Sequence, residues 1–166
     1  KFNKAPSFSN ALLQNIAGGN TMVFNHAAKI LLEKVGRVNA ISHDWWTYQL
    51  ISGAGGFVYY DYVPHIIYRQ HKNSLIGARD GIFNVIIRIY ELLKGRYRQY
   101  NNCQCECLSK SKHFLKPKNV SLLEWFQNMR NSNLFTRMDF FFRSGVYRQT
   151  KIGSLGFLFA LILRKV

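Results

Sequence analysis

At the centre of the predicted fold is the stretch Ser42-His43-Asp44-Trp45-Trp46. Ser42 is a favourable N-cap residue, so we expect a helix to begin directly after it, with Asp44 in the first turn. The helix dipole favours an ionised carboxylate at that position, and an ionised carboxylate can accept a proton. On spacing alone the plainer interpretation is favoured, in which Asp44 only complements the helix terminus.

A second polar group follows downstream in the tetrapeptide YRQH, residues 68–71. Aromatic and β-branched residues at 57–60 and 65–68 predict two short strands before it. The imidazole of His71 falls just past the second strand, where a loop begins, and loops carry functional residues disproportionately. A histidine considered alone is more often structural or solvated than a metal ligand. Together with the carboxylate of Asp44 and nearby aromatic rings, however, this group predicts an active-site wall.

Upstream, the tripeptide GGN at residues 18–20 predicts a tight turn, and residues 21–24 then predict a short buried strand. A glycine-rich turn allows the backbone to approach a ligand closely. The turn lacks the spacing of a Walker or dinucleotide-binding loop, so an ordinary turn is an equally good interpretation. Residues 27–35 predict a helix that ends at Gly36.

The C-terminal part of the chain is predicted to be mainly helical. Residues 79–94 give the clearest amphipathic pattern, with apolar side chains at i, i+3, i+4 and i+7. The capping-box pattern SLLE at 121–124 predicts a helix that runs to about Arg130, and residues 135–143 predict another. Residues 153–166 are apolar on nearly all sides, so we expect them either to be buried or to lie in a membrane interface.

Composition restricts the possible partners and the class of fold. The 166 residues suit one compact domain, or one domain with a helical appendage. Twenty-three Lys and Arg against 8 Asp and Glu give a net charge of +15, which implies a polyanionic neighbour: nucleic acid, an anionic membrane surface or phosphorylated small molecules. The longest apolar run, residues 155–163, is too short to span a bilayer. The first residues read like the middle of a longer protein, so we expect a fragment.

The cysteines lie in one tight cluster at Cys103, Cys105 and Cys107. An odd number in so short a segment is not a disulfide framework and indicates a reducing compartment. Free thiols are the default interpretation. A structural zinc site completed by His113 is the minority alternative, because Cys-x-Cys-x-Cys does not match the usual paired spacing.

Taken in order, several segments resemble the second half of family-two glycosyltransferases, in particular the rhamnosyltransferase-like enzymes of bacterial surface polysaccharide assembly. The matching segments are GNTMVFN at 19–25, HDWW at 43–46, YD at 60–61, YRQH-x-N at 68–73 and SGVYRQT at 144–150. Each segment alone is a weak signal, but their ordered combination is fairly specific and covers most of the chain.

The resemblance implies an α/β fold of the GT-A type, a mixed-sheet sandwich. Residues 1–95 would be the acceptor-side half of the catalytic domain, and residues 96–166 a basic, mainly helical C-terminal region. Such enzymes typically invert the anomeric configuration. Asp44 would be the general base that deprotonates the acceptor hydroxyl, which then attacks the anomeric carbon as the nucleoside diphosphate leaves. The resemblance also implies the substrate-binding residues Gly19, Asn20, Thr21, His43, Trp45, Trp46 and Arg69, and a metal ligand in His71.

The sequence departs from the family in lacking the metal-binding Asp-x-Asp and the nucleotide-binding strands that precede it. A divalent cation, Mn²⁺ or Mg²⁺, would therefore be bound mainly by residues that this chain does not contain, and the isolated chain is expected to have little activity. The implied function is transfer of a sugar from a nucleotide-sugar donor to a polysaccharide or polyprenyl-linked saccharide acceptor. Its expected location is the cytoplasmic face of the bacterial plasma membrane, where basic residues and an apolar tail would meet anionic lipid.

Two alternatives remain at this point. The missing Asp-x-Asp is compatible with a catalytically inactive protein that acts as a scaffold on the membrane surface. The basic aromatic segment at residues 96–100 suggests a nucleic-acid-binding module instead. A nucleic-acid partner is not expected, because the positive residues are scattered and no recognised nucleic-acid motif is present.

Overall fold

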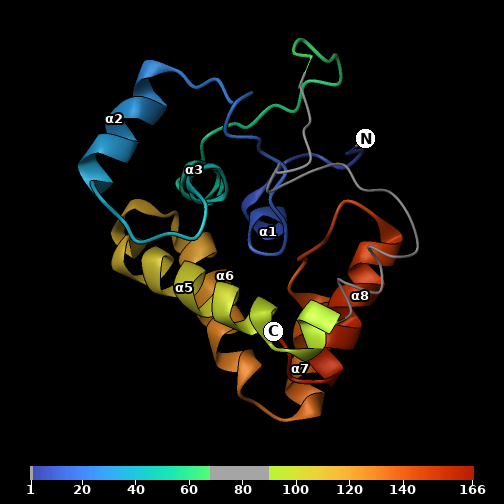
Figure 1. The fold of residues 1–166 in the computed structure, drawn as a ribbon. Coiled ribbons are helices and arrows are strands. Elements are labelled where there is room, and N and C mark those ends of the chain that lie inside the picture. The colour runs from blue at the N-terminus through green and yellow to red at the C-terminus, as the bar shows by residue number, and fades with distance from the viewer. Residues whose placement is uncertain (1, 68–89) are drawn as a thin grey trace.

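The protein consists of helices joined by loops in the part of the chain that the structure, a computed structural model, describes: residues 2–67 and 90–166 (Figure 1). In chain order the elements are α1 (Phe8–Ala11), α2 (His26–Val35), α3 (His43–Gly53), α5 (Arg96–Lys110), the 3₁₀ turn η1 (Lys112–Phe114), α6 (Pro117–Arg130), α7 (Leu134–Arg143) and α8 (Lys151–Ile162). These residues contain no β-strand. The predicted α/β fold, a GT-A mixed-sheet sandwich, is therefore wrong.

The segments predicted as strands are turns and irregular loops instead. Residues 21–24 and 57–60 pair with no other segment of the described chain, and their apolar side chains stay in water: Val23 is 95% exposed and Phe57 is 89% exposed. A strand needs a neighbour for its backbone hydrogen bonds and a covered face for its side chains. Neither is present here, so β propensity alone does not produce a sheet. The third predicted strand, residues 65–68, runs past the described residues at its end, and its described part is loop.

Helix α3 is the central element, and it contacts α1, α2 and α5 (Figure 1). It begins at His43 after Ser42, as the sequence predicts. Its side chains are buried without interruption from Trp46 to Leu50, so neighbours cover it on more than one side. Close packing continues to its end, where Gly53 faces Leu115 and Phe8 with no room for a larger side chain.

The core is a cluster of apolar side chains that α3 shares with the C-terminal helices. Its fully buried members include Leu50, Leu108, Leu123, Phe126, Met129, Phe140 and Leu161. The rings of Trp125 and Phe126 in α6 lie 5.2 and 5.8 Å from that of Phe140 in α7. This packing joins α6 and α7 to the rest of the molecule.

Most of the predicted helices are present, with shifted ends. The helix expected at 27–35 is α2, which Asn25 caps at its start and Gly36 ends with φ 71°. The helix expected to begin at Ser121 begins instead at Pro117, because proline is well suited to the first helical turn. Ser121 lies inside α6, where its hydroxyl donates a hydrogen bond to the carbonyl of Pro117. The helix predicted over 79–94 lies mostly outside the described residues.

The N-terminal segment is hydrogen-bonded to a loop near the other end of the chain. Gln149 donates its side-chain amide to the carbonyl of Lys4 and accepts from the Lys4 amide at 2.9 Å. Asn10 donates to the carbonyl of Tyr147 at 3.0 Å. The backbone amide of Gln149 donates in turn to Gln14 at 2.9 Å. These contacts hold α1 between α3 and the loop that precedes α8.

Candidate functional site

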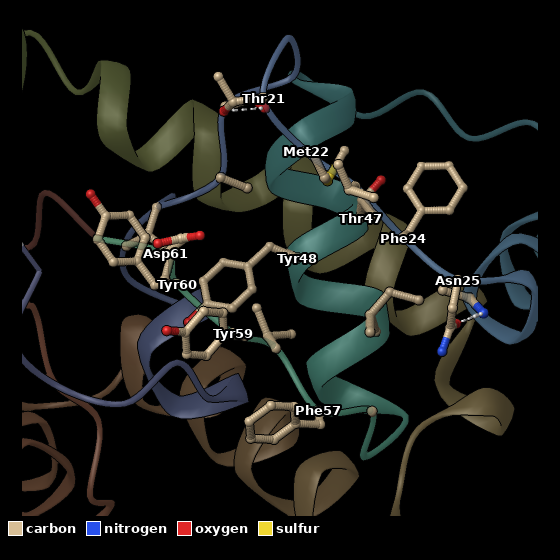
Figure 2. Close-up of a pocket in the computed structure, with 18 of the residues that line it drawn as sticks. Thr21, Met22, Phe24, Asn25, Thr47, Tyr48, Phe57, Tyr59, Tyr60 and Asp61 are labelled. Carbon is tan, nitrogen blue, oxygen red and sulfur yellow. Dashed lines mark hydrogen bonds between the residues drawn. The ribbon is translucent and has the colours of Figure 1, made fainter. Parts of the chain in front are cut away.

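A cavity of about 860 Å³ lies on one side of α3 within the described residues (Figure 2). Three parts of the chain form it: residues 16–31, the face of α3 that carries Thr47, Tyr48 and Ile51, and residues 54–65. Its volume is typical of small-molecule sites, which also combine apolar walls with a few polar groups. We take this cavity, called the α3 pocket below, as the candidate site.

Aromatic side chains from separate segments form the walls of the α3 pocket. Phe24 comes from the segment before α2, and Phe57, Tyr59 and Tyr60 come from the loop after α3 (Figure 2). Phe57, Tyr59 and Phe24 are 89%, 69% and 47% exposed, so their rings are available to a ligand. Rings of this kind offer flat apolar faces together with the phenolic hydroxyls of tyrosine. Such a lining suits a ligand with apolar C–H faces and polar edges.

A carboxylate and an imidazole face each other at the edge of the α3 pocket. His65 Nε2 lies 3.0 Å from Asp61 Oδ2, and Asp61 Oδ1 accepts the backbone N–H of Val63 at 2.9 Å. The pKa of Asp61 lies below its usual value, first because of the hydrogen bond from Val63 and then because of that from His65. The Asp61 carboxylate is therefore ionised at neutral pH. Both side chains are open to solvent, so the pair is accessible.

Asp44 lies at the N-terminal end of the α3 face that continues into the pocket. It precedes Thr47 and Tyr48 by three and four residues, a spacing that puts side chains on the same side of a helix. Its Oδ1 atom accepts the Trp45 backbone N–H at 2.7 Å and the hydroxyl of Ser42. Its Oδ2 atom accepts no hydrogen bond from the described residues. Asp44 therefore stabilises the helix start with one oxygen and leaves the other available, although Asp44 itself does not line the pocket.

Two of the predicted substrate-binding residues, Gly19 and His43, are brought into contact. A Cβ atom on Gly19 would lie 2.4 Å from Nε2 of His43, so the backbone of the glycine turn lies directly against the imidazole. Thr21 closes this turn with a hydrogen bond from its amide to the carbonyl of Gly18 at 3.0 Å, and it lines the pocket. Asn20 is exposed at the tip of the turn. The predicted turn thus connects the start of α3 with the pocket.

The two tryptophans have structural contacts. Trp46 is 4% exposed and belongs to the core cluster. Trp45 is half-buried, and its indole N–H donates to the carbonyl of Ala11 at 2.7 Å, which ties α3 to the end of α1. Neither residue lines the α3 pocket.

Arg69 and His71, the predicted guanidinium and metal ligand, lie outside the described residues. Within the described ranges, no group of three or more His, Cys, Asp or Glu side chains is close enough to hold a metal ion. The residues described here therefore do not by themselves form the Mn²⁺ or Mg²⁺ site that the resemblance implies, and we derive no reaction step through a metal.

The cysteine cluster lies away from the α3 pocket, on α5. Cys105 and Cys107 are buried, while Cys103 is half-buried and donates its thiol hydrogen to the carbonyl of Asn39. Burial raises the pKa of the Cys105 thiol to about 11, although the nearby Arg130 opposes this. Two of the three thiols are thus core side chains.

Comparison with protein-family models, with curated proteins and with solved structures finds no match for this chain. No helix in the described residues is long and apolar enough to cross a membrane.

Sequence reasoning missed the interaction between Asp61 and His65. Asp61 lies in a turn, in which its Oδ1 accepts the backbone N–H of Val63. The additional signal was the Asp-x-x-x-His spacing, which lets the chain fold back so that the imidazole reaches the carboxylate. Phe24 and Phe57 were also missed as pocket walls, because the predicted strands would have buried them.

Proposed function

We propose that this chain is the acceptor-binding part of a glycosyltransferase and that the acceptor saccharide binds in the α3 pocket. The observation that carries the proposal is the continuity of one α3 face, on which Asp44 is followed by the pocket residues Thr47, Tyr48 and Ile51. The carboxylate of Asp44, of which only Oδ1 accepts hydrogen bonds from the described residues, therefore lies one helical turn, about 5 Å along the axis, from a pocket with aromatic walls.

The lining of the pocket supports a saccharide more than a fully apolar ligand. A sugar ring has a C–H face that packs on aromatic rings and hydroxyls that need hydrogen-bond partners. The rings of Phe57 and Tyr59 supply the first kind of surface, and the hydroxyl of Tyr59 and the carboxylate of Asp61 supply the second. A planar, highly charged ligand would need a positive lining, but among the described residues of the pocket wall the one side chain that can be cationic is His65.

The proposed reaction is an inverting transfer from a nucleotide-sugar donor to a hydroxyl of the bound saccharide. The acceptor oxygen forms a bond to the anomeric carbon, the bond from that carbon to the diphosphate breaks, and the hydroxyl proton passes to a base. We assign the base to Asp44, whose Oδ2 accepts no hydrogen bond from the described chain. A general base of this kind contributes roughly 10²–10⁴ in rate.

The Asp61–His65 pair is a second candidate for the base. The ionised Asp61 lies 3.0 Å from the imidazole and can orient it. Unlike Asp44, both residues line the pocket directly. If Asp44 is the base, catalysis should be impaired by substitution of Asp44. If the pair is the base, catalysis should be impaired by substitution of His65.

The test separates binding from catalysis. Saturation-transfer NMR with rhamnose, glucose and N-acetylglucosamine on this chain should give ring-proton signals that disappear in Phe57→Ala. Phe135→Ala, which removes an exposed ring from α7, is the matched control and should leave the signals unchanged. No saturation transfer from any of the three sugars would remove the saccharide assignment of the pocket.

Catalysis is measured as sugar transfer from a nucleotide-sugar donor by a protein that contains this chain. In Asp44→Asn, kcat should fall by about 10² or more while saccharide binding is retained. His65→Gln should change kcat by less than tenfold if Asp44 is the base. The opposite pattern would assign the base to His65. Retained saccharide binding without transfer in the wild-type protein would favour the inactive surface protein instead.

A further inference from the structure

Helix α8 is apolar on two opposite faces, of which the described residues cover only one. Phe157, Ala160 and Leu161 are buried in the core. On the other side of the helix lies a stripe of exposed apolar side chains, called the α8 stripe below: Ile152 at 83%, Leu155 at 63%, Phe159 at 50% and Ile162 at 45%. At 3.6 residues per turn these four positions share one face. A helix that is apolar all round is normally buried all round, so the α8 stripe lacks its cover.

The position of α8 is fixed by contacts on its buried side. The guanidinium of Arg137, itself 4% exposed, donates to the carbonyls of Leu161 and Ile162 at the end of the helix. Just before the start, Gln149 donates its side-chain amide to the carbonyl of Lys4 at 3.0 Å. Because both ends are anchored, the helix cannot roll to bury the α8 stripe.

On its buried side, α8 packs against α7, which carries a further exposed aromatic ring. Phe141 lies 6.2 Å from Phe157 between ring centroids, and Phe142, which is 73% exposed, lies 5.2 Å from Phe141. In Figure 1, α7 and α8 lie together at one side of the molecule.

The charges around the α8 stripe favour one kind of cover. Lys151 begins the helix, and Arg164 and Lys165 follow its end. No acidic residue occurs after Asp139. A second copy of a chain with a net charge of +15 would bring like charges together at this surface, which costs energy. An anionic lipid surface offers negative charge at the level of the cations and hydrocarbon below it.

We propose that the α8 stripe docks onto the surface of an anionic lipid bilayer, with α8 parallel to the membrane plane. A 12-residue helix is about 18 Å long, much less than the roughly 30 Å of bilayer hydrocarbon, so it lies on the membrane rather than across it. The apolar side chains enter the boundary between headgroups and acyl chains. Lys151, Arg164 and Lys165 remain at the headgroups, since their long stems let the charge reach the polar layer. This inference does not depend on the proposed sugar transfer.

The test is flotation of the full chain with vesicles of phosphatidylcholine alone and of phosphatidylcholine mixed with phosphatidylglycerol. Wild-type protein should float with the mixed vesicles, and added salt should weaken the binding. Leu155→Glu should lower the partition coefficient at least tenfold. Ile30→Glu on α2 is the matched control, because it makes the same charge change at another exposed apolar side chain, and it should bind nearly as well as wild type.

A second pair of variants tests the cations. Lys151→Gln should weaken binding to the mixed vesicles about fivefold, the change that corresponds to about 1 kcal/mol for one cation at an anionic surface. Lys118→Gln, an exposed lysine on α6, removes the same charge at a different place and should have a smaller effect. Equal effects of Leu155→Glu and Ile30→Glu, or no flotation of the wild type, would overturn the proposal. So would a wild-type dimer in light scattering that Leu155→Glu converts to a monomer, because the cover would then be a second copy.

Discussion

Gln104 on α5 is 2% exposed, and neither Oε1 nor Nε2 of its side chain has a hydrogen-bond partner in the described structure. A buried amide without partners loses its hydration and gains nothing in return. Asn119 on α6 is the opposite case at similar burial, since its Nδ2 donates to the carbonyl of Gly53 at 2.7 Å. The two residues show that burial alone does not make a polar side chain destabilising.

Gln104→Met should therefore raise the free energy of unfolding by about 1 kcal/mol, because an apolar side chain of similar volume replaces the unpaired amide. Urea unfolding followed by circular dichroism measures the change. Asn119→Leu is the control, and it should lower the free energy of unfolding by about 0.5–1.5 kcal/mol, because it removes one of the two hydrogen bonds to the Gly53 carbonyl and leaves only that from the Lys116 amide. Destabilisation by Gln104→Met would mean that the amide has a partner.

The thiols should differ in reactivity with pH. The thiolate is the reactive form, and burial raises the pKa of Cys105 to about 11, so Cys105 remains a thiol through pH 8–9. Iodoacetamide at pH 8 should label Cys103 first, since it is only half-buried, and Cys105 only slowly. Mass spectrometry of timed samples measures the order, and unfolding in urea should remove it. Labelling of Cys105 in the folded protein as fast as Cys103 would contradict the burial.

Residue patterns predicted part of the candidate site. Ser42 takes the N-cap position before α3 as expected, with φ −146°, but its hydroxyl donates to Asp44 instead of accepting a backbone amide of the helix. A neighbouring carboxylate competes for the hydroxyl, and spacing does not reveal which partner wins. The contact of Gly19 with His43 joins two segments that the resemblance had named separately. It depends on the path of the chain between them, so no local pattern contains it.

At the scale of elements, glycine has opposite consequences in two helices. In α3, a Cβ atom on Gly53 would lie 2.7 Å from Leu115 and 3.0 Å from Phe8, both of which are buried. In α8, a Cβ atom on Gly156 would meet nothing within 4 Å. The first glycine permits close packing, whereas the second only adds conformational entropy to the unfolded chain.

The same substitution should thus have opposite signs at the two positions. Gly53→Ala should lower the free energy of unfolding by about 1–3 kcal/mol through overpacking. Gly156→Ala should raise it by about 0.5–1 kcal/mol, because alanine is the better helix former. Thermal and urea unfolding of both variants give the comparison. A stabilising Gly53→Ala would show that α3 does not pack closely against Leu115.

Helices were easier to predict than strands for a physical reason. A helix satisfies its backbone hydrogen bonds within its own segment, so local patterns located α2, α6 and α7 to within a few residues. A strand depends on a distant partner, which the residues at 57–60 do not have in the described chain. Helix α5 was not predicted as a separate element. Its first half, from Arg96 to Asn102, is mostly polar, and its buried residues all lie between Gln104 and Leu108, so no amphipathic pattern extends along the helix.

At the scale of the whole molecule, charge is strongly unbalanced. The chain carries +15, and its ion pairs in the described residues are exposed pairs such as Lys29–Glu33 and Lys110–Glu106. Exposed pairs of this kind contribute little to stability. The repulsion among the remaining cations therefore opposes the compact state.

Moderate salt should accordingly raise the melting temperature. Ions at about 0.1 M screen charges beyond roughly 10 Å, so they reduce the long-range repulsion and leave the core unaffected. We expect Tm to rise by a few degrees between low salt and 0.2 M NaCl, about what 1 kcal/mol gives for a chain of this size. KCl at the same ionic strength is the control for specific ion binding and should give the same rise. A Tm that falls with added salt would contradict the claim that repulsion among the cations destabilises the folded protein.

The hydrogen bonds between residues 4–14 and 147–149 connect parts of the chain that are made at different times. As a ribosome synthesises the protein, Lys4 and Asn10 emerge well before Tyr147 and Gln149, and they find these partners only after the intervening residues have appeared. A product that stopped short of Tyr147 would leave α1 without its partners on that side and open to proteases. The native position of α1 thus reports that translation has passed Gln149.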